Sequence, residues 1–192
     1  MDHILFEAIE FAVHAHRGHF RKSTLIPYIV HPLNVGRILL EYGCSVVVVT
    51  AGILHDTLED TPVVFEDILT RFGEDVANLV SWVSEPDKSD IWENRKEHTL
   101  ASLESASQEV LLIALADKLD NIQSIHRALE REGDAVWSRF SRPIGAQAWY
   151  YQNLVDVFRR RVNEEPGLSL CKALQAGVEQ VFRGVDPDPD LA

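Results

Sequence analysis

Apolar residues recur at helical spacing along nearly the whole chain, and this pattern is the strongest constraint on its fold. The first such segment has apolar residues three and four positions apart, as on one face of an amphipathic helix: Ile4, Leu5, Ala8, Ile9, Ala12 and Val13. Further helices are predicted at about residues 32–42, 45–57, 65–73, 74–84, 92–103, 109–132, 147–162 and 168–182. The sequence therefore predicts an all-α fold.

The run Val46–Val49 is the one segment that would also suit a strand, because β-branched residues favour extended backbone. We predict a helix there, since no other segment offers a strand partner. The chain has 192 residues, no internal repeat and no clear boundary, which indicates one domain over 1–185. Its core is expected at about 5–160 and its C-terminal helices at about 147–183. Residues 186–192, rich in Asp and Pro, are predicted to be a disordered tail.

The formal net charge of −12 argues against nonspecific binding to nucleic acid or anionic membranes. A phosphorylated substrate would then need a local basic patch. Cys44 and Cys171 are far apart and suit a reducing compartment. The sequence shows neither a signal-peptide pattern nor a membrane-spanning stretch, so we expect a cytoplasmic protein. Nothing in it fixes an oligomeric state, and a homo-oligomer remains an option.

Residues 52–61 place a His-Asp doublet, His55-Asp56, close to an acidic doublet, Glu59-Asp60. Residues four apart share one face of a helix, and an apolar stretch leads directly into this run. Burying imidazole and carboxylate groups together is costly unless they bind something, and a divalent metal is the usual occupant. The run indicates a metal-dependent hydrolase.

Four residues are candidate metal ligands: His31, His55, Asp56 and Asp117. Asp117 follows the apolar run 110–116, where an ionised carboxylate needs a partner. Two imidazoles and two carboxylates suit manganese, iron or zinc, with positions left for water. The absence of clustered thiols argues against a structural zinc site.

Four motifs carry a resemblance to a known family: residues 15–23, 27–32, 54–61 and 115–121. The set His31, His55-Asp56 and Asp117 resembles the H…HD…D signature of the HD phosphohydrolase superfamily. Together the motifs are similar to the hydrolase domain of RelA/SpoT-type alarmone enzymes, and most of all to its stand-alone form, the small alarmone hydrolases. The resemblance spans about residues 5–160 and implies a single HD-domain helical bundle.

The resemblance implies a Mn²⁺-dependent hydrolase that removes the 3′-diphosphate of (p)ppGpp, giving GDP or GTP and pyrophosphate. Fe²⁺ or Zn²⁺ would also suit the site. The family's catalytic Glu-Asp pair corresponds to Glu59-Asp60, which would orient a metal-bound water and handle its proton. Arg21 would stack on the base, and Asn121 would bond the ribose. The full set of implied substrate contacts is Arg21, Lys22, Ser23, Tyr28, Asn121, Arg95 and Lys96. These basic residues would supply the local patch that an acidic chain needs.

Some alternatives stay open. A solvated helix face is the simpler interpretation of Arg95-Lys96, and Glu59-Asp60 would also suit an exposed helix end before Pro62. Asp120 stands where the family commonly has His or Tyr, and it adds negative charge beside the site. The alternative substrates are an adenine alarmone or the phosphate of NADPH. A nucleotide sensor without hydrolysis is a further alternative, although it would not need the ligand set.

Overall fold

The computed structural model describes residues 2–84 and 89–188, and every regular element within these ranges is helical. The same ranges contain an isolated β-bridge between Phe20 and Pro27. The elements are α1 (Asp2–Ala15), α2 (Val30–Glu41), α3 (Val46–Leu54), α4 (Thr57–Asp60), α5 (Phe65–Phe72), α6 (Glu74–Val83), α7 (Trp92–Leu103), α8 (Gln108–Glu132), the 3₁₀ helix η1 (Gly133–Arg139), α9 (Ile144–Arg161) and α10 (Gly167–Val181). The all-α prediction is confirmed.

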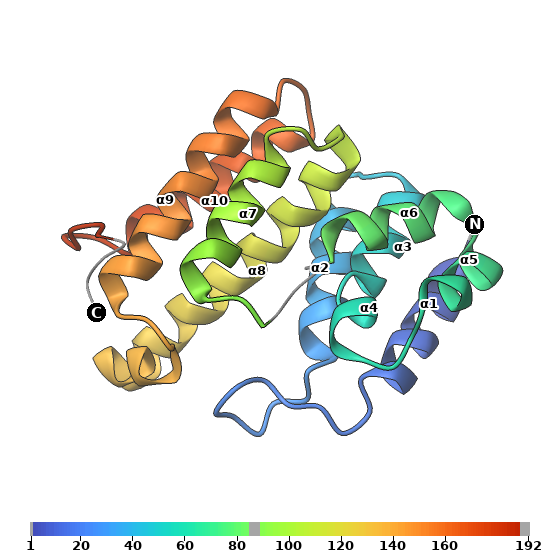
Figure 1. Cartoon of the computed structure of the whole chain (residues 1–192), viewed down its shortest axis with the longest axis horizontal. Coiled ribbons are helices and arrows are strands. Elements are labelled where there is room, and N and C mark those ends of the chain that lie inside the picture. The colour runs from blue at the N-terminus through green and yellow to red at the C-terminus, as the bar shows by residue number, and fades with distance from the viewer. Residues whose placement is uncertain (1, 85–88, 189–192) are drawn as a thin grey trace.

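The long helix α8 lies at the centre of the bundle (Figure 1). On one side it packs against α2, α3 and α6, with α1 and α5 farther out. On its other side lie α9 and α10, and α7 packs against α9. Between residues 110 and 126 no side chain of α8 is exposed, which explains the apolar run that precedes Asp117.

Local signals in the sequence fix where α3 and α8 begin. The Ser45 hydroxyl accepts a hydrogen bond from the Val48 amide (3.4 Å), and the Ser107 hydroxyl accepts one from the Val110 amide (3.3 Å). Gly133, with φ of 58°, ends α8. The four valines at 46–49 lie in α3, so the choice of helix over strand is confirmed.

The third predicted helix ends earlier than expected, at Leu54 rather than near Thr57. Side chains take over the last carbonyls of α3: His55 Nδ1 bonds the Gly52 carbonyl (2.8 Å), and the Thr57 hydroxyl donates to the Leu54 carbonyl (2.7 Å). His55 and Asp56 form a turn, and the four-residue helix α4 follows. The first doublet therefore forms the break between the two helices, and the second doublet lies beyond it in α4.

Two glycines allow α2 and α3 to approach closely. A Cβ atom on Gly36 would lie 2.5 Å from Cγ1 of Ile53, and one on Gly52 would lie 2.3 Å from Cδ1 of Leu39. A larger residue at either position would force Ile53 or Leu39, or the helices themselves, to move. The start of α2 consequently lies beside the end of α3, with the ring centroids of His31 and His55 5.1 Å apart.

Residues 186–188 carry no regular secondary structure, and 189–192 lie outside the described residues, so the disordered tail stays a prediction. None of the helices in the described ranges is both long and apolar enough to cross a membrane.

Candidate metal centre and active site

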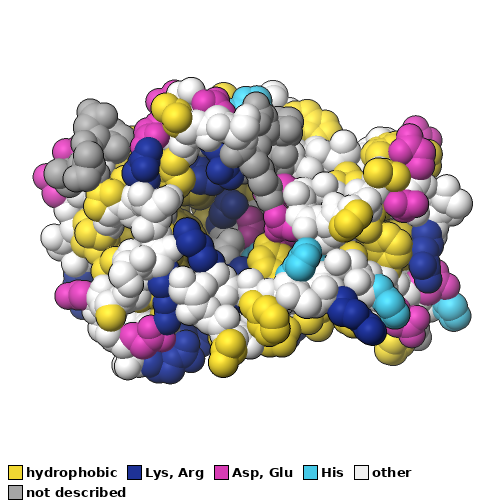
Figure 2. Space-filling model, turned by 60° about the horizontal axis from the view of Figure 1, so that its bottom comes forward, with side chains coloured by type: hydrophobic (Ala, Val, Ile, Leu, Met, Phe, Trp, Pro, Cys, Tyr) yellow, Lys and Arg dark blue, Asp and Glu magenta, His cyan; other side chains and the backbone are white. Residues whose placement is uncertain are grey.

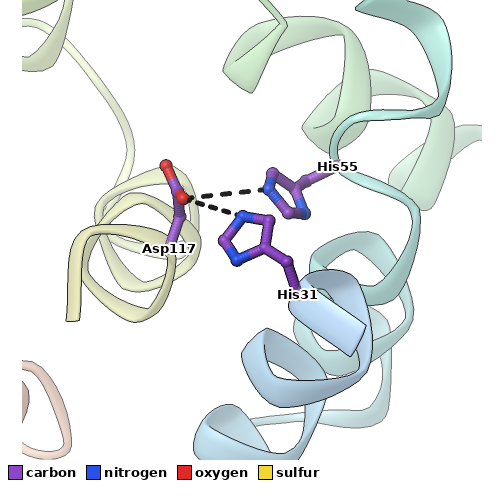
Figure 3. A group of neighbouring side chains, drawn as sticks. All are labelled: His31, His55 and Asp117. Carbon is purple, nitrogen blue, oxygen red and sulfur yellow. Dashed lines mark ion pairs between the residues drawn. The ribbon is translucent and has the colours of Figure 1, made fainter. Parts of the chain in front are cut away.

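Four predicted ligands from three parts of the fold converge on one point. His31 lies in the first turn of α2, His55 follows α3, and Asp117 lies near the middle of α8 (Figure 3). Asp56 follows His55 in the turn between α3 and α4. Nε2 of His31 is 3.1 Å from Oδ1 of Asp117 and 3.6 Å from Oδ2 of Asp56. Nε2 of His55 is 3.0 Å from the same Asp56 oxygen and 4.0 Å from the Asp117 oxygen. The structure brings all four residues together.

Both imidazole rings are held so that Nε2 faces this point. The Gly52 carbonyl can only accept, so Nδ1 of His55 carries the proton in their 2.8 Å hydrogen bond. Nδ1 of His31 donates in the same way to Oδ2 of Asp120, at 2.7 Å. Each ring therefore directs the lone pair of Nε2 inward, which is the arrangement that a metal-binding histidine needs.

The chemistry of the donors fits a divalent metal. Among the described residues, Nε2 of His55 is a buried polar atom with no hydrogen-bond partner. One ligand atom each from His31, His55 and Asp117 lies within 4.8 Å of the others. A cation at this point would satisfy the buried nitrogen and offset two carboxylate charges at once.

The pKa values of the histidines and of Asp56 also indicate that this pocket favours positive charge. Burial lowers the pKa of His55, but the negative charge of Asp56, whose Oδ2 lies 3.0 Å from Nε2, prevails and raises that pKa to about 9. The pKa of His31 is also raised, because bonds to Asp117 and Asp120 outweigh burial. Burial works against the charge of Asp56, yet His55 and His31 hold its pKa below the usual value. Two carboxylates in this pocket thus require cationic partners, protons or a metal.

Two adjoining cavities meet at the metal centre. The smaller, of about 580 Å³, contains His55, Asp56 and Asp117 together with Glu59 and Arg95. The larger has a volume of about 990 Å³. Both are lined by Arg21, Tyr28, His31, Lys96, Lys118, Asn121 and Tyr150. The two cavities form one cleft with the ligand cluster on its floor.

The larger cavity is strongly cationic. Its described lining includes eight basic residues, Arg21, Lys22, Arg37, Lys96, Lys118, Arg127, Arg131 and Arg139, and two acidic ones, Asp120 and Glu132. Figure 2 shows Lys and Arg side chains around and inside the hollow in the molecular surface. In a chain of net charge −12 this concentration of positive charge favours an anionic ligand.

A model of the family described as HD domain matches residues 8–147. The chain belongs to the HD-domain family. The match covers α2, α3, α4 and α8, and so it includes all four candidate ligands.

Relatives of this HD-domain protein carry alarmone hydrolase names. It is 40% identical over 127 residues to the guanosine-3′,5′-bis(diphosphate) 3′-pyrophosphohydrolase MESH1 of Xenopus tropicalis, covering 65% of this chain and 70% of the relative. It is 43% identical over 122 residues to the enzyme of that activity from Aquifex aeolicus, covering 62% of this chain but only 17% of that protein. Among solved structures, a metazoan ortholog of SpoT that hydrolyses ppGpp aligns with a TM-score of 0.71 at 28% identity, over 95% of this chain and 96% of that chain.

The predicted substrate residues of the HD domain all line the cleft. Lys22 and Ser23 line the larger cavity and Arg95 the smaller, while Arg21, Tyr28, Lys96 and Asn121 line both. Arg95 and Lys96 are half-buried rather than on a solvated helix face.

Three of these residues also bond within the site itself. The Tyr28 hydroxyl donates to Oδ2 of Asp56 (2.6 Å), and the Asn121 amide donates to Oδ1 of Asp117 (2.6 Å). Arg21 in turn donates to the amide oxygen of Asn121 (3.0 Å). Hydrogen bonds thereby connect the predicted substrate residues directly to the candidate metal ligands.

The two members of the predicted catalytic pair occupy different places. Both lie in α4 and are half-buried. Glu59 lines the cavity that holds the ligand cluster, whereas Asp60 is not among its lining residues. Glu59 therefore borders the same cavity as the candidate metal ligands, and Asp60 does not.

Lys118 is a site residue that the sequence reasoning missed. Its ammonium donates to Oδ2 of Asp117 at 2.6 Å, and it lines both cavities. Burial lowers the pKa of Lys118, but the charge of Asp117 outweighs burial and raises it well above the usual value. The sequence feature that could have indicated Lys118 is its position directly after Asp117.

The cleft wall contains further residues that the sequence did not indicate. Tyr150 and Tyr151 come from α9, while Arg127 and Arg131 lie near the end of α8 and Arg139 at the end of η1. They lie outside the family motifs, and those of α9 and η1 reach the cleft only through the fold.

Proposed function

We propose that this HD-domain protein is a metal-dependent 3′-pyrophosphohydrolase of guanosine alarmones. It converts ppGpp or pppGpp and water into GDP or GTP and pyrophosphate. The observation that carries the proposal is the position of the cluster His31, His55, Asp56 and Asp117 on the floor of a cationic cleft. The names of the relatives give the same activity.

In this reaction, the oxygen of water adds to the phosphorus bonded to the ribose 3′-oxygen. The bond between that phosphorus and the 3′-oxygen breaks, and the 3′-oxygen takes a proton as it leaves. A bound divalent cation supplies a water of lowered pKa and polarises a phosphoryl oxygen. Glu59, which faces the same cavity, accepts the proton of the attacking water.

Charged residues of the wall hold the substrate. Arg95, Lys96 and Lys118 lie where the 3′-diphosphate would meet the ligand cluster, and they stabilise its charge. Arg21 and Asn121 orient the nucleoside beside them. Tyr28 keeps Asp56 in place through its hydroxyl.

We further propose Mn²⁺ as the cation, since two imidazoles, two carboxylates and no thiol suit it. Fe²⁺ and Zn²⁺ are the competitors, and metal analysis of the purified protein separates the three. We also propose that the protein acts in the cytoplasm on small nucleotides and does not bind nucleic acid; both cysteines are free thiols, as a reducing compartment requires.

The decisive experiment incubates the purified chain and Mn²⁺ with ppGpp, pppGpp, the adenine counterpart and NADPH, and identifies the products. We expect pyrophosphate and the 5′-nucleotide from the guanosine substrates, and loss of turnover with a chelator. Orthophosphate from NADPH as the fastest reaction would instead establish the alternative phosphohydrolase. Tight binding of ppGpp without product, in the presence of Mn²⁺, would establish the sensor.

A further inference from the structure

Asp120 is a buried carboxylate that contacts a candidate metal ligand from behind. It lies on α8, one turn after Asp117, and is 3% exposed. Its Oδ2 atom is 2.7 Å from Nδ1 of His31, on the opposite side of the ring from the metal-facing nitrogen. Its Oδ1 atom accepts a hydrogen bond from the amide of Asn34 (2.9 Å), one turn after His31 on α2. Asp120 therefore joins the two helices that supply His31 and Asp117.

Both oxygens of Asp120 have protein partners despite their burial. A guanidinium nitrogen of Arg127 lies 3.7 Å from Oδ1 and partly offsets the charge. The carboxylate is thus satisfied within the protein and directed at His31. Its negative charge is therefore paired within the protein and is not left free to repel a bound nucleotide.

The two histidines of the cluster differ in what orients them. Nδ1 of His55 donates to a neutral carbonyl, that of Gly52, whereas Nδ1 of His31 donates to a carboxylate. A carboxylate behind a metal-binding imidazole fixes its tautomer and makes Nε2 a better donor to the cation. His31 is also nearly completely buried, so solvent does not weaken the contact.

We propose that Asp120 is a positioning residue that strengthens metal binding through His31. The proposal rests on the metal site of the proposed function but not on the identity of the substrate. Asp120 acts by holding Nδ1–H of His31 and by adding negative charge behind the ring. Asn34 and Arg127 hold Asp120 in turn.

The test measures Mn²⁺ binding to the metal-depleted full chain by calorimetric titration, without any nucleotide. Asp120→Asn keeps an oxygen that can accept from His31 but removes the charge, and we expect about tenfold weaker binding. Asp120→Ala removes both and should approach about 100-fold. Affinities of both variants within twofold of the unmodified chain would overturn the proposal.

A control variant separates the contact with His31 from general support of α2 and α8. Asn34→Ala removes a partner of Asp120 but leaves the 2.7 Å contact with His31, so the affinity should fall less than in Asp120→Asn. Equal losses in the two variants would count against a specific role of the Asp120–His31 contact.

Imidazole ¹⁵N–¹H spectra of the metal-depleted protein provide a second readout. The Nδ1–H signal of His31 should shift in Asp120→Asn, whereas that of His55, bonded to Gly52, should stay in place and serve as an internal control. An unchanged His31 signal would contradict the proposal. Neither measurement contains an alarmone, so a failure of alarmone hydrolysis would leave their results intact.

Discussion

The floor of the cleft, formed by the ligand cluster, and its wall, formed by the other lining residues, differ in how their side chains are held. On the floor, the buried groups of the ligand cluster are held by fixed partners, such as Gly52 behind His55 and Asp120 behind His31. On the wall, long cationic side chains such as Lys22 and Arg131 are exposed to solvent. The floor is rigid before any ligand arrives, whereas the wall can adjust to one.

This difference has an energetic reason. A metal ion tolerates little error in the position of its donors, and buried ionic groups are costly unless every partner is present. Phosphate groups are larger, flexible and partly hydrated, and solvent-exposed cations interact with them through screened charges. Substitutions on the floor should therefore abolish function, while single substitutions on the wall should only weaken binding.

The largest effect is expected from Asp117→Asn. The variant keeps the shape of the side chain but removes a ligand charge, so Mn²⁺ content should fall and turnover of ppGpp should drop at least about 10³-fold. Metal analysis and steady-state rates measure both. Asp134→Asn, an exposed carboxylate outside the cleft, is the matched control and should change neither. Retained turnover in Asp117→Asn would break the assignment of the floor.

A smaller effect is expected in α4, where the floor meets the reaction space. Glu59→Gln should lower kcat by about 10²–10⁴-fold while Mn²⁺ content stays constant, because a proton acceptor is lost but no ligand is. Asp60→Asn should cost less, since Asp60 does not line the cavity. A larger loss for Asp60→Asn than for Glu59→Gln would reverse the roles assigned to the pair.

On the wall, Arg21→Gln should raise KM for ppGpp about tenfold with a modest change in kcat, because a charge-assisted contact near the nucleoside is lost. Arg21→Lys is the informative companion: it keeps the charge but not the planar group. If Arg21→Lys behaves like the unmodified chain, charge alone explains the contact and stacking on the base does not.

The smallest effect is expected from Arg131→Gln at the far end of the larger cavity. KM should rise about two- to threefold at low salt, and the difference should shrink at high ionic strength because the side chain is exposed. Arg183→Gln changes the net charge equally but lies outside the lining of the cleft, so it controls for general electrostatics. A loss in Arg131→Gln that rivals Asp117→Asn would erase the distinction between floor and wall.

The sequence predicted the floor far better than the wall. The helices follow from apolar spacing, and the four ligands lie in short motifs whose residue types match metal chemistry. The break between α3 and α4 was missed, because the residues on both sides suit a helix and side-chain bonds to Gly52 and Leu54 decide where it ends. The local sequence pattern does not show whether such side-chain hydrogen bonds will end a helix.

Other parts of the wall were not predicted, for a different reason. Tyr150, Tyr151 and Arg139 reach the cleft only because α9 and η1 fold back beside α8. The role of Asp120 was likewise invisible, since it depends on α2 crossing α8 at His31. From the sequence alone, Asp120 could be described only as an additional negative charge beside the site.

The single helix α8 carries both a metal ligand, Asp117, and a distal cation of the cleft, Arg131. At a rise of 1.5 Å per residue, their separation of fourteen residues corresponds to about 21 Å along one helix axis. The helix thus fixes the distance between the ligand cluster and this distal cation. Inserting one residue after Asn121 would turn every later side chain by about 100° and swing Arg131 off the cleft. Under the proposed function, the register of α8 would set the distance from the ligand cluster to Arg131, and changing that distance would require rebuilding a helix instead of a loop.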